Sequence, residues 1–69
     1  MKEYHKEIQK EIIEILKKYG KLTTKQILEK LKPSHHFLKE IELQDILSDM
    51  RDKKLIKEGL ISGEKAYFV

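Results

Sequence analysis

Three aspartates are spaced so that an α-helix would carry them on one face. Asp45, Asp49 and Asp52 stand at i, i+4 and i+7, which places them along one side of a helix. Such an acidic stripe opposes DNA binding, because each carboxylate about 7 Å from a phosphate costs roughly 0.6 kcal/mol in bulk water and about 2.4 kcal/mol at an effective dielectric constant of 20. The stripe has two interpretations: a solvated face that keeps the protein soluble, or a surface that binds a basic partner protein.

Basic residues gather in the preceding part of the chain. Residues 17–39 contain seven Lys and one Glu, and such charge asymmetry is informative about partners. Lysines can contact DNA phosphates, and the N-terminus of a helix adds backbone donors. The candidate DNA-contacting residues of this segment and of the C-terminal hairpin are Lys21, Lys25, Lys32, His35, His36, Lys39, Lys57 and Lys65. Each lysine alone is explained as solvated surface, so the indication comes from the cluster.

No group of residues in the sequence points to catalysis or to metal binding. The pair His35–His36 has no third His, no Cys and no fixed carboxylate nearby, so it makes a weak metal site. The sequence also contains no Gly-rich phosphate loop and no nucleophile motif. We expect no enzyme activity, no metal and no cofactor.

The first element that must position these residues is a predicted helix over residues 2–19. Its apolar residues recur at spacings of three and four, and Gly20 ends the pattern; they are Tyr4, Ile8, Ile12, Ile15, Leu16 and Tyr19. Ile13 lies about 100° from Ile12 around the helix, at the margin of this stripe. It is either part of a wider core stripe or an exposed contact of a homodimer.

A second helix is predicted to begin at Thr23. Thr23 as N-cap and Gln26 three residues later form a capping box, and Leu22 can pack against Ile27 as a hydrophobic staple. Pro33 cannot continue the helix and disfavours a helical Lys32.

A loop and a third helix are predicted to follow. Residues 33–41 lack a regular pattern, and Ser34 is expected to cap one short turn that buries Phe37 and Leu38. The third helix is expected to begin near Glu42, because its apolar residues share one face and leave Ile41 off it; they are Leu43, Ile46, Leu47 and Met50.

The C-terminal residues are predicted to form a β-hairpin. Strands are expected at residues 55–62 and 65–69, joined by a type II′ turn with Gly63 and Glu64 at its centre, since a glycine at the first central position accommodates positive φ. This turn would place Leu60 opposite Tyr67 and Ile61 opposite Ala66.

Length and composition indicate a single domain that spans residues 1–69. A chain this short gains only about 3–5 kcal/mol from its core. Cysteine is absent, and no apolar run reaches the roughly 18 residues that span a membrane. We therefore expect a cytoplasmic protein with no membrane contact.

Lys outnumbers Arg 14 to 1 and Asn is absent, a composition typical of thermophile proteins.

Three helices followed by a C-terminal hairpin, with KLTTKQILEKL before the loop and ILSDMRDKKLIKEG after it, resemble the winged helix-turn-helix superfamily of archaeal and bacterial transcription regulators. The resemblance implies a mainly α fold with a small β-hairpin, α+β by strict accounting, in which the hairpin is the wing. It also implies a short strand at residues 21–22, directly before the second helix. It also implies that the third helix lies in the major groove of DNA. There Gln44 would read adenine, Arg51 would read guanine, and Ser48 would accept several bases.

The sequence therefore predicts a DNA-binding protein, a small transcription regulator that contacts duplex DNA through the basic second helix, the loop and the wing. The long loop and the acidic third helix depart from the usual pattern of the superfamily. The alternative is a protein-interaction module that uses the acidic face of the third helix.

Overall fold

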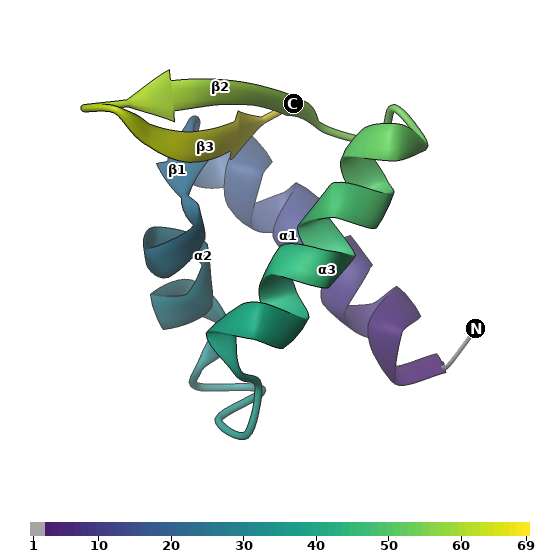
Figure 1. Cartoon of the computed structure of the whole chain (residues 1–69). Coiled ribbons are helices and arrows are strands. Elements are labelled where there is room, and N and C mark those ends of the chain that lie inside the picture. Colours follow the sequence, from purple (N-terminus) through teal and green to yellow (C-terminus); the bar gives the residue numbers. More distant parts are fainter. Residues whose placement is uncertain (1–2) are drawn as a thin grey trace.

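The computed structural model describes residues 3–69, with side chains from His5 onward, and these residues form three helices and a three-stranded antiparallel sheet (Figure 1). In chain order the elements are α1 (Glu3–Tyr19), β1 (Leu22–Thr23), α2 (Thr24–Leu31), α3 (Glu40–Asp52), β2 (Lys57–Ile61) and β3 (Glu64–Phe68). The sheet lies across one end of the helices. The protein is thus a small α+β fold, as the sequence predicts.

α1 is held by an apolar stripe with a spacing of four residues. Ile8, Ile12 and Leu16 are almost completely buried. Gly20 ends the helix with φ +83°, and its N–H donates to the carbonyl of Leu16 at 2.9 Å, a common use of glycine at a helix C-terminus. The predicted end is confirmed, whereas the predicted start at residue 2 and the side chain of Tyr4 lie outside the described residues.

Ile13 on α1 is half-buried and packs against the hydrophobic core. The wider core stripe therefore accounts for it, and its role in a homodimer stays a prediction.

α2 begins with the capping box that the sequence predicts. The Thr23 hydroxyl accepts from the backbone N–H of Gln26 at 3.3 Å, and the Gln26 side-chain oxygen accepts from the N–H of Thr23 at 2.9 Å. Leu22 and Ile27 both belong to the core. The helix ends at Leu31, before Pro33, as predicted.

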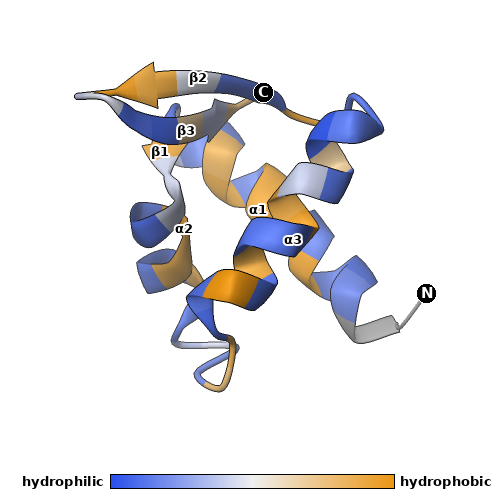
Figure 2. Ribbon diagram, viewed as in Figure 1, coloured by the Kyte–Doolittle hydropathy of each residue, from blue (hydrophilic) through white to orange (hydrophobic). Residues whose placement is uncertain are grey.

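The loop between α2 and α3 corrects one expectation. Leu38 is buried, but Phe37 is 84% exposed. The N–H of Leu38 bonds to the carbonyl of His35 at 3.0 Å, which puts Phe37 at the tip of a turn, and neighbours at a turn tip cannot both face the core. α3 begins at Glu40, two residues before the predicted position, and Ile41 on its first turn is exposed as expected. Figure 2 shows that hydrophobic and hydrophilic residues alternate along all three helices.

Because of the way α3 ends, the hairpin starts later in the chain than predicted. The N–H of Leu55 donates to the carbonyl of Met50 and that of Lys54 to Arg51, both at 2.9 Å, and Lys54 has φ +63°. This pattern is a Schellman motif, which ends a helix with a left-handed residue. The motif includes Leu55, the first residue of the predicted strand, and β2 begins two residues later at Lys57.

The turn and register of the hairpin also differ from the prediction. Ser62 and Gly63 are the two loop residues, with φ +52° and +83°. Positive φ at both positions defines a type I′ turn, not type II′. The observed pairs are Leu60–Lys65 and Ile61–Glu64, in place of Leu60–Tyr67 and Ile61–Ala66. Each partner moves by two residues, so every side chain keeps its predicted face.

β3 is the central strand of the sheet, between β1 and β2. β1 pairs with it through Leu22–Tyr67 and Thr23–Ala66, so the short predicted strand exists one residue later than expected. This pairing fixes the start of α2 beside β3, because β1 leads directly into that helix.

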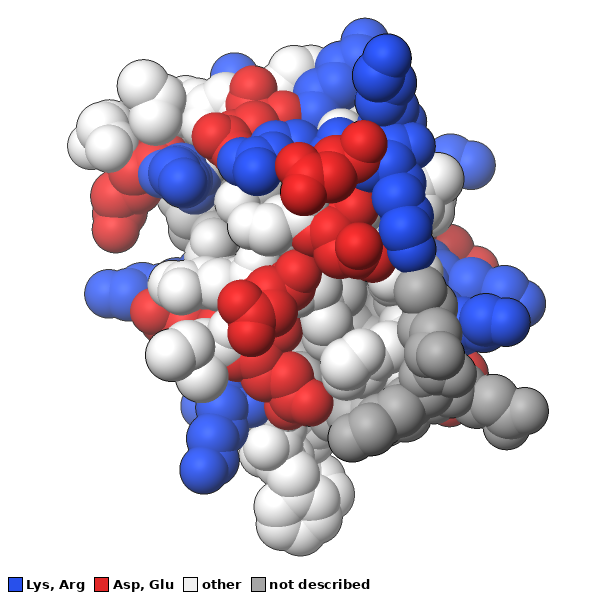
Figure 3. Space-filling model, turned by 45° about the vertical axis from the view of Figure 1, so that its right-hand side comes forward, with Lys and Arg blue, Asp and Glu red and all other residues white. Residues whose placement is uncertain are grey.

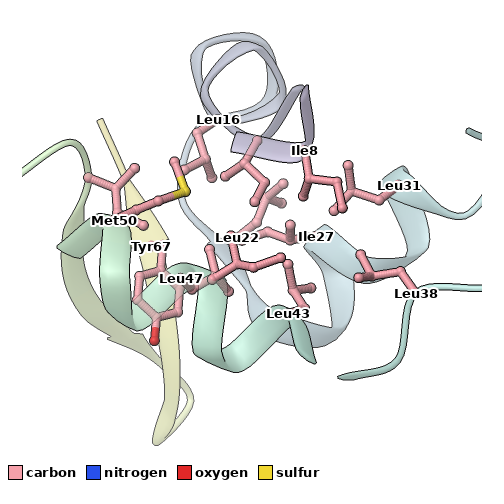
Figure 4. Close-up of a cluster of buried hydrophobic side chains, with 13 residues drawn as sticks. Ile8, Leu16, Leu22, Ile27, Leu31, Leu38, Leu43, Leu47, Met50 and Tyr67 are labelled. Carbon is pink, nitrogen blue, oxygen red and sulfur yellow. The ribbon is translucent and has the colours of Figure 1, made fainter. Parts of the chain in front are cut away.

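The core is built where all three helices meet the sheet. Figure 4 shows side chains from the helices and from the sheet pointing toward one another. The cluster comprises Ile8, Ile12, Leu16, Leu22, Ile27, Leu31, Leu38, Leu43, Ile46, Leu47, Met50, Ile56 and Tyr67. In the described part of the chain, no helix has the length and apolar character that a membrane crossing requires.

Candidate nucleic-acid interface

A polar hollow lies where the start of α2, one side of α3 and β3 meet. It consists of two adjoining depressions of about 230 and 270 Å³ that share Thr24, Gln44 and Lys65. The other lining residues are Thr23, Lys25, Glu40, Asp45, Ser48, Glu64 and Tyr67. We call this place the α2–β3 hollow.

Two sides of α3 differ in chemistry. Gln44 and Ser48 line the α2–β3 hollow, and both are uncharged donors and acceptors. On the side that faces α1, Glu42 lies 3.5 Å from His5, and Asp49 lines a separate depression with His5. Asp45 lines both places. Gln44 and Ser48 thus lie away from Glu42 and Asp49 but share their side of α3 with Asp45.

The predicted acidic stripe exists, and it is partly neutralised. Figure 3 shows a band of carboxylates across the surface over α3. Asp49 pairs with Lys53 at 3.1 Å, and Asp52 pairs with Arg51 at 3.2 Å. Within the described residues, Asp45 has no ion pair closer than 4 Å. Asp45 is therefore the member of the stripe whose charge is most available to a ligand.

Arg51 faces β2, where Glu58 is its main partner. Its guanidinium donates to the Glu58 carboxylate at 2.5 Å and to Asp52 at 3.2 Å. The hydrogen bond with Glu58, followed by that with Asp52, raises the pKa of Arg51 above its ordinary value. A role in reading guanine would require this guanidinium to leave two carboxylates.

The predicted basic residues do not form one continuous surface. Lys25 and Lys65 meet at the α2–β3 hollow, whereas Lys32 and Lys39 are exposed on either side of the loop after α2. By helical projection Lys25 and Lys32 share one edge of α2, but Glu29 lies on that edge about 40° from Lys25.

Two other predicted lysines lie at the sheet. The Lys21 ammonium stands 5.1 Å from the centre of the Phe68 ring, and a side chain at Gly59 would approach it to 3.1 Å. Lys57 is exposed on β2. Both can add positive charge near the hairpin, although neither lines the hollow.

The two loop histidines have separate surroundings. His35 is mostly buried and contacts the carboxylate of Glu11 on α1. The His36 ring lies 4.3 Å from the exposed ring of Phe37. The structure therefore places His35 against α1, so that of the two histidines only His36 is exposed. Among the described side chains, no group of three His, Cys, Asp or Glu could hold a metal ion.

Tyr67 is a lining residue that was predicted only as part of a strand. It is 4% exposed, its ring lies in the core (Figure 4), and its hydroxyl is at the outer end of the ring. Burial raises the pKa of the Tyr67 hydroxyl, the charge of Glu58 raises it further, and that of Arg51 lowers it. The sequence did contain a signal for this role of Tyr67: the two-residue period of β3 can put this amphipathic side chain on the face toward the core.

Comparisons with protein-family models, with curated proteins and with solved structures give no significant match to this chain.

Proposed function

We propose that this protein is a winged-helix DNA-binding domain that acts as a small transcription regulator. The order of three helices and a hairpin, with β1 joined to the hairpin, supports the winged-helix assignment. In this proposal the β2–β3 hairpin is the wing, and duplex DNA contacts the start of α2 and the hairpin.

One observation carries the proposal: Lys25 and Lys65, from distant parts of the sequence, line the same hollow as Gln44 and Ser48. Cations from two elements and uncharged hydrogen-bonding side chains from a third are what DNA backbone contacts require. Glu42 and Asp49, which would repel phosphates, lie on the other side of α3.

Three carboxylates oppose this binding, because Glu40, Asp45 and Glu64 also line the hollow. Lysine has a longer stem than Asp or Glu, so its ammonium can reach a phosphate before the carboxylates do. The mixed charge makes us expect weak binding to arbitrary duplexes, with dissociation constants on the order of 10⁻⁴ to 10⁻⁶ M at physiological salt.

A paired charge substitution tests the location of the DNA contact. The double variant K25Q/K65Q should reduce the slope of log K against log salt by about 1.8, since each lost phosphate contact changes it by about 0.9. The matched control is K10Q/K17Q, which removes the same charge from exposed positions of α1 and should leave the slope nearly unchanged. Equal effects of the two double variants in fluorescence titrations would contradict the proposed contact.

A second candidate is a protein-interaction module, which the carboxylate band over α3 favours (Figure 3). A basic partner would meet Asp45 first, because Asp49 and Asp52 already have cationic neighbours. The two candidates predict opposite results for Asp45→Lys: weaker binding of a basic protein, but tighter binding of DNA.

A further inference from the structure

Tyr67 is a buried residue whose hydroxyl has no hydrogen bond within the described part of the chain. The residue is 4% exposed, and among the described residues no side chain or backbone group bonds to its hydroxyl. Every fully buried side-chain oxygen or nitrogen there has a partner, so this hydroxyl reaches the surface. Tyr67 lines the α2–β3 hollow, and the charges of Glu58 and Arg51 also act on its hydroxyl. An otherwise buried hydroxyl is thus directed at whatever fills the hollow.

Other donors converge on the same place from three elements. Thr24 lies in the first turn of α2, Ser48 on α3 and Lys65 on β3, and all three line the depression with Tyr67. The first backbone N–H groups of a helix have no partner within it, and in α2 the Thr23 cap takes only that of Gln26. The first turn of α2 has no acidic residue. The hollow therefore offers hydroxyl and ammonium donors to an acceptor beside the start of α2, with the Asp45 carboxylate on the same lining.

The shape of the hollow selects the kind of acceptor. The bases of duplex DNA present their edges inside the grooves. A hydroxyl that is recessed between two elements of the protein cannot reach into a groove. The non-bridging oxygens of a phosphodiester lie on the outside of the duplex and carry the negative charge. Such an oxygen can enter a depression and meet several donors at once.

We propose that the Tyr67 hydroxyl donates a hydrogen bond to a non-bridging oxygen of one DNA backbone phosphate seated in the α2–β3 hollow. Lys65 supplies charge to this phosphate, Thr24 and Ser48 supply further hydroxyls, and Asp45 opposes it. The inference rests on the proposed DNA binding and names the group that the hollow would contact.

The protonation state of Tyr67 agrees with this role. Burial raises the pKa of the hydroxyl above its ordinary value, so at neutral pH it carries the proton that it must donate.

The test combines Tyr67→Phe with duplexes in which one phosphate at a time is replaced by a neutral methylphosphonate. Tyr67→Phe should weaken binding to the unmodified duplex by about tenfold, the effect of a hydrogen bond to a charged group. It should leave the salt slope unchanged, because no charge is lost. At one phosphate position the methylphosphonate should weaken the wild type more than the variant, because the variant has already lost the Tyr67 hydrogen bond but keeps the contacts of Lys65 and Ser48, and such a coupling identifies direct contact.

Two controls separate this contact from loss of structure. Tyr19→Phe changes an exposed ring on α1 and should bind like the wild type at every position. Ser48→Ala removes a second hydroxyl of the hollow and should show the same coupled position, which keeps the test decisive if Tyr67→Phe folds poorly. Circular dichroism melts confirm that each variant is folded.

The outcomes are distinguishable. If the wild type binds duplex DNA but Tyr67→Phe binds equally well, or no phosphate position couples to it, this inference is wrong and the proposed function stands. If the wild type binds no duplex at low salt, both fail. Saturation of the hollow by inorganic phosphate at low millimolar concentration, lost in Tyr67→Phe, would overturn the inference in favour of a free phosphate ligand.

Discussion

Arg51 and Glu58 connect the last turn of α3 to β2 through a hydrogen-bonded ion pair at 2.5 Å. Arg51 was predicted as a base-reading residue because it lies on the solvent side of α3. The sequence could not show that the Schellman motif after α3 returns the chain so that Glu58 meets this guanidinium. A side chain's partner depends on such tertiary placement, whereas its helix face follows from spacing alone.

Replacing Glu58 tests the importance of this ion pair for the fold. We expect Glu58→Gln to lower the urea midpoint of unfolding slightly, because a partly exposed ion pair contributes little. The side chain of Asp52, the weaker partner, is 70% exposed, so Asp52→Asn should have a smaller effect. A larger fall in the urea midpoint for Asp52→Asn than for Glu58→Gln would contradict the ranking of Glu58 as the main partner of Arg51.

Tyr67 should make the free energy of unfolding depend on pH in the alkaline range. Burial is the main reason that its pKa in the folded protein lies above the ordinary value of 10.0. A group with a raised folded pKa contributes stability that is complete below the unfolded pKa and is lost as pH rises through the folded pKa. The free energy of unfolding, from urea titrations at pH 9 and pH 11, should therefore fall more for the wild type than for Tyr67→Phe. Equal falls would argue against a raised pKa of Tyr67 in the folded protein.

Among the elements, those specified by neighbouring residues were predicted best. The capping box of α2 joins residues only three apart, Thr23 and Gln26, so its chemistry is visible in the sequence. The hairpin was predicted with the wrong turn because Gly63 can serve as either central residue. The structure uses it second, after Ser62 with φ +52°. A non-glycine residue at positive φ is uncommon, and composition alone does not reveal it.

Lys54 offers a test at the level of the element. It takes the left-handed position of the Schellman motif with φ +63°, where a side chain costs about 1 kcal/mol relative to glycine. Lys54→Gly should therefore raise the free energy of unfolding by about 0.5–1 kcal/mol in urea titrations. Lys54→Ala is the control, because it removes the same charge but keeps a Cβ. A similar gain in both variants would assign the effect to charge instead of backbone conformation.

At the scale of the whole molecule, the sequence predicted an uneven distribution of charged residues, and the fold determines where these residues lie relative to one another. The acidic stripe and the basic segment exist, but the stripe has its own cationic partners and the lysines separate into groups at the two ends of α2. Their separation could not be predicted, because the loop of residues 32–39 sets the position of α3 relative to α2. The α2–β3 hollow is a product of that placement and of the pairing between β1 and β3.

The most direct test of the proposed DNA contact is a titration of fluorescently labelled duplex with the wild-type protein at several salt concentrations. With two to four lysines at phosphates, drawn from Lys25, Lys65 and the nearby Lys21 and Lys57, log K should fall with log salt at a slope between about −2 and −4. Failure to bind at the lowest salt, or binding that does not weaken as salt increases, would contradict the account.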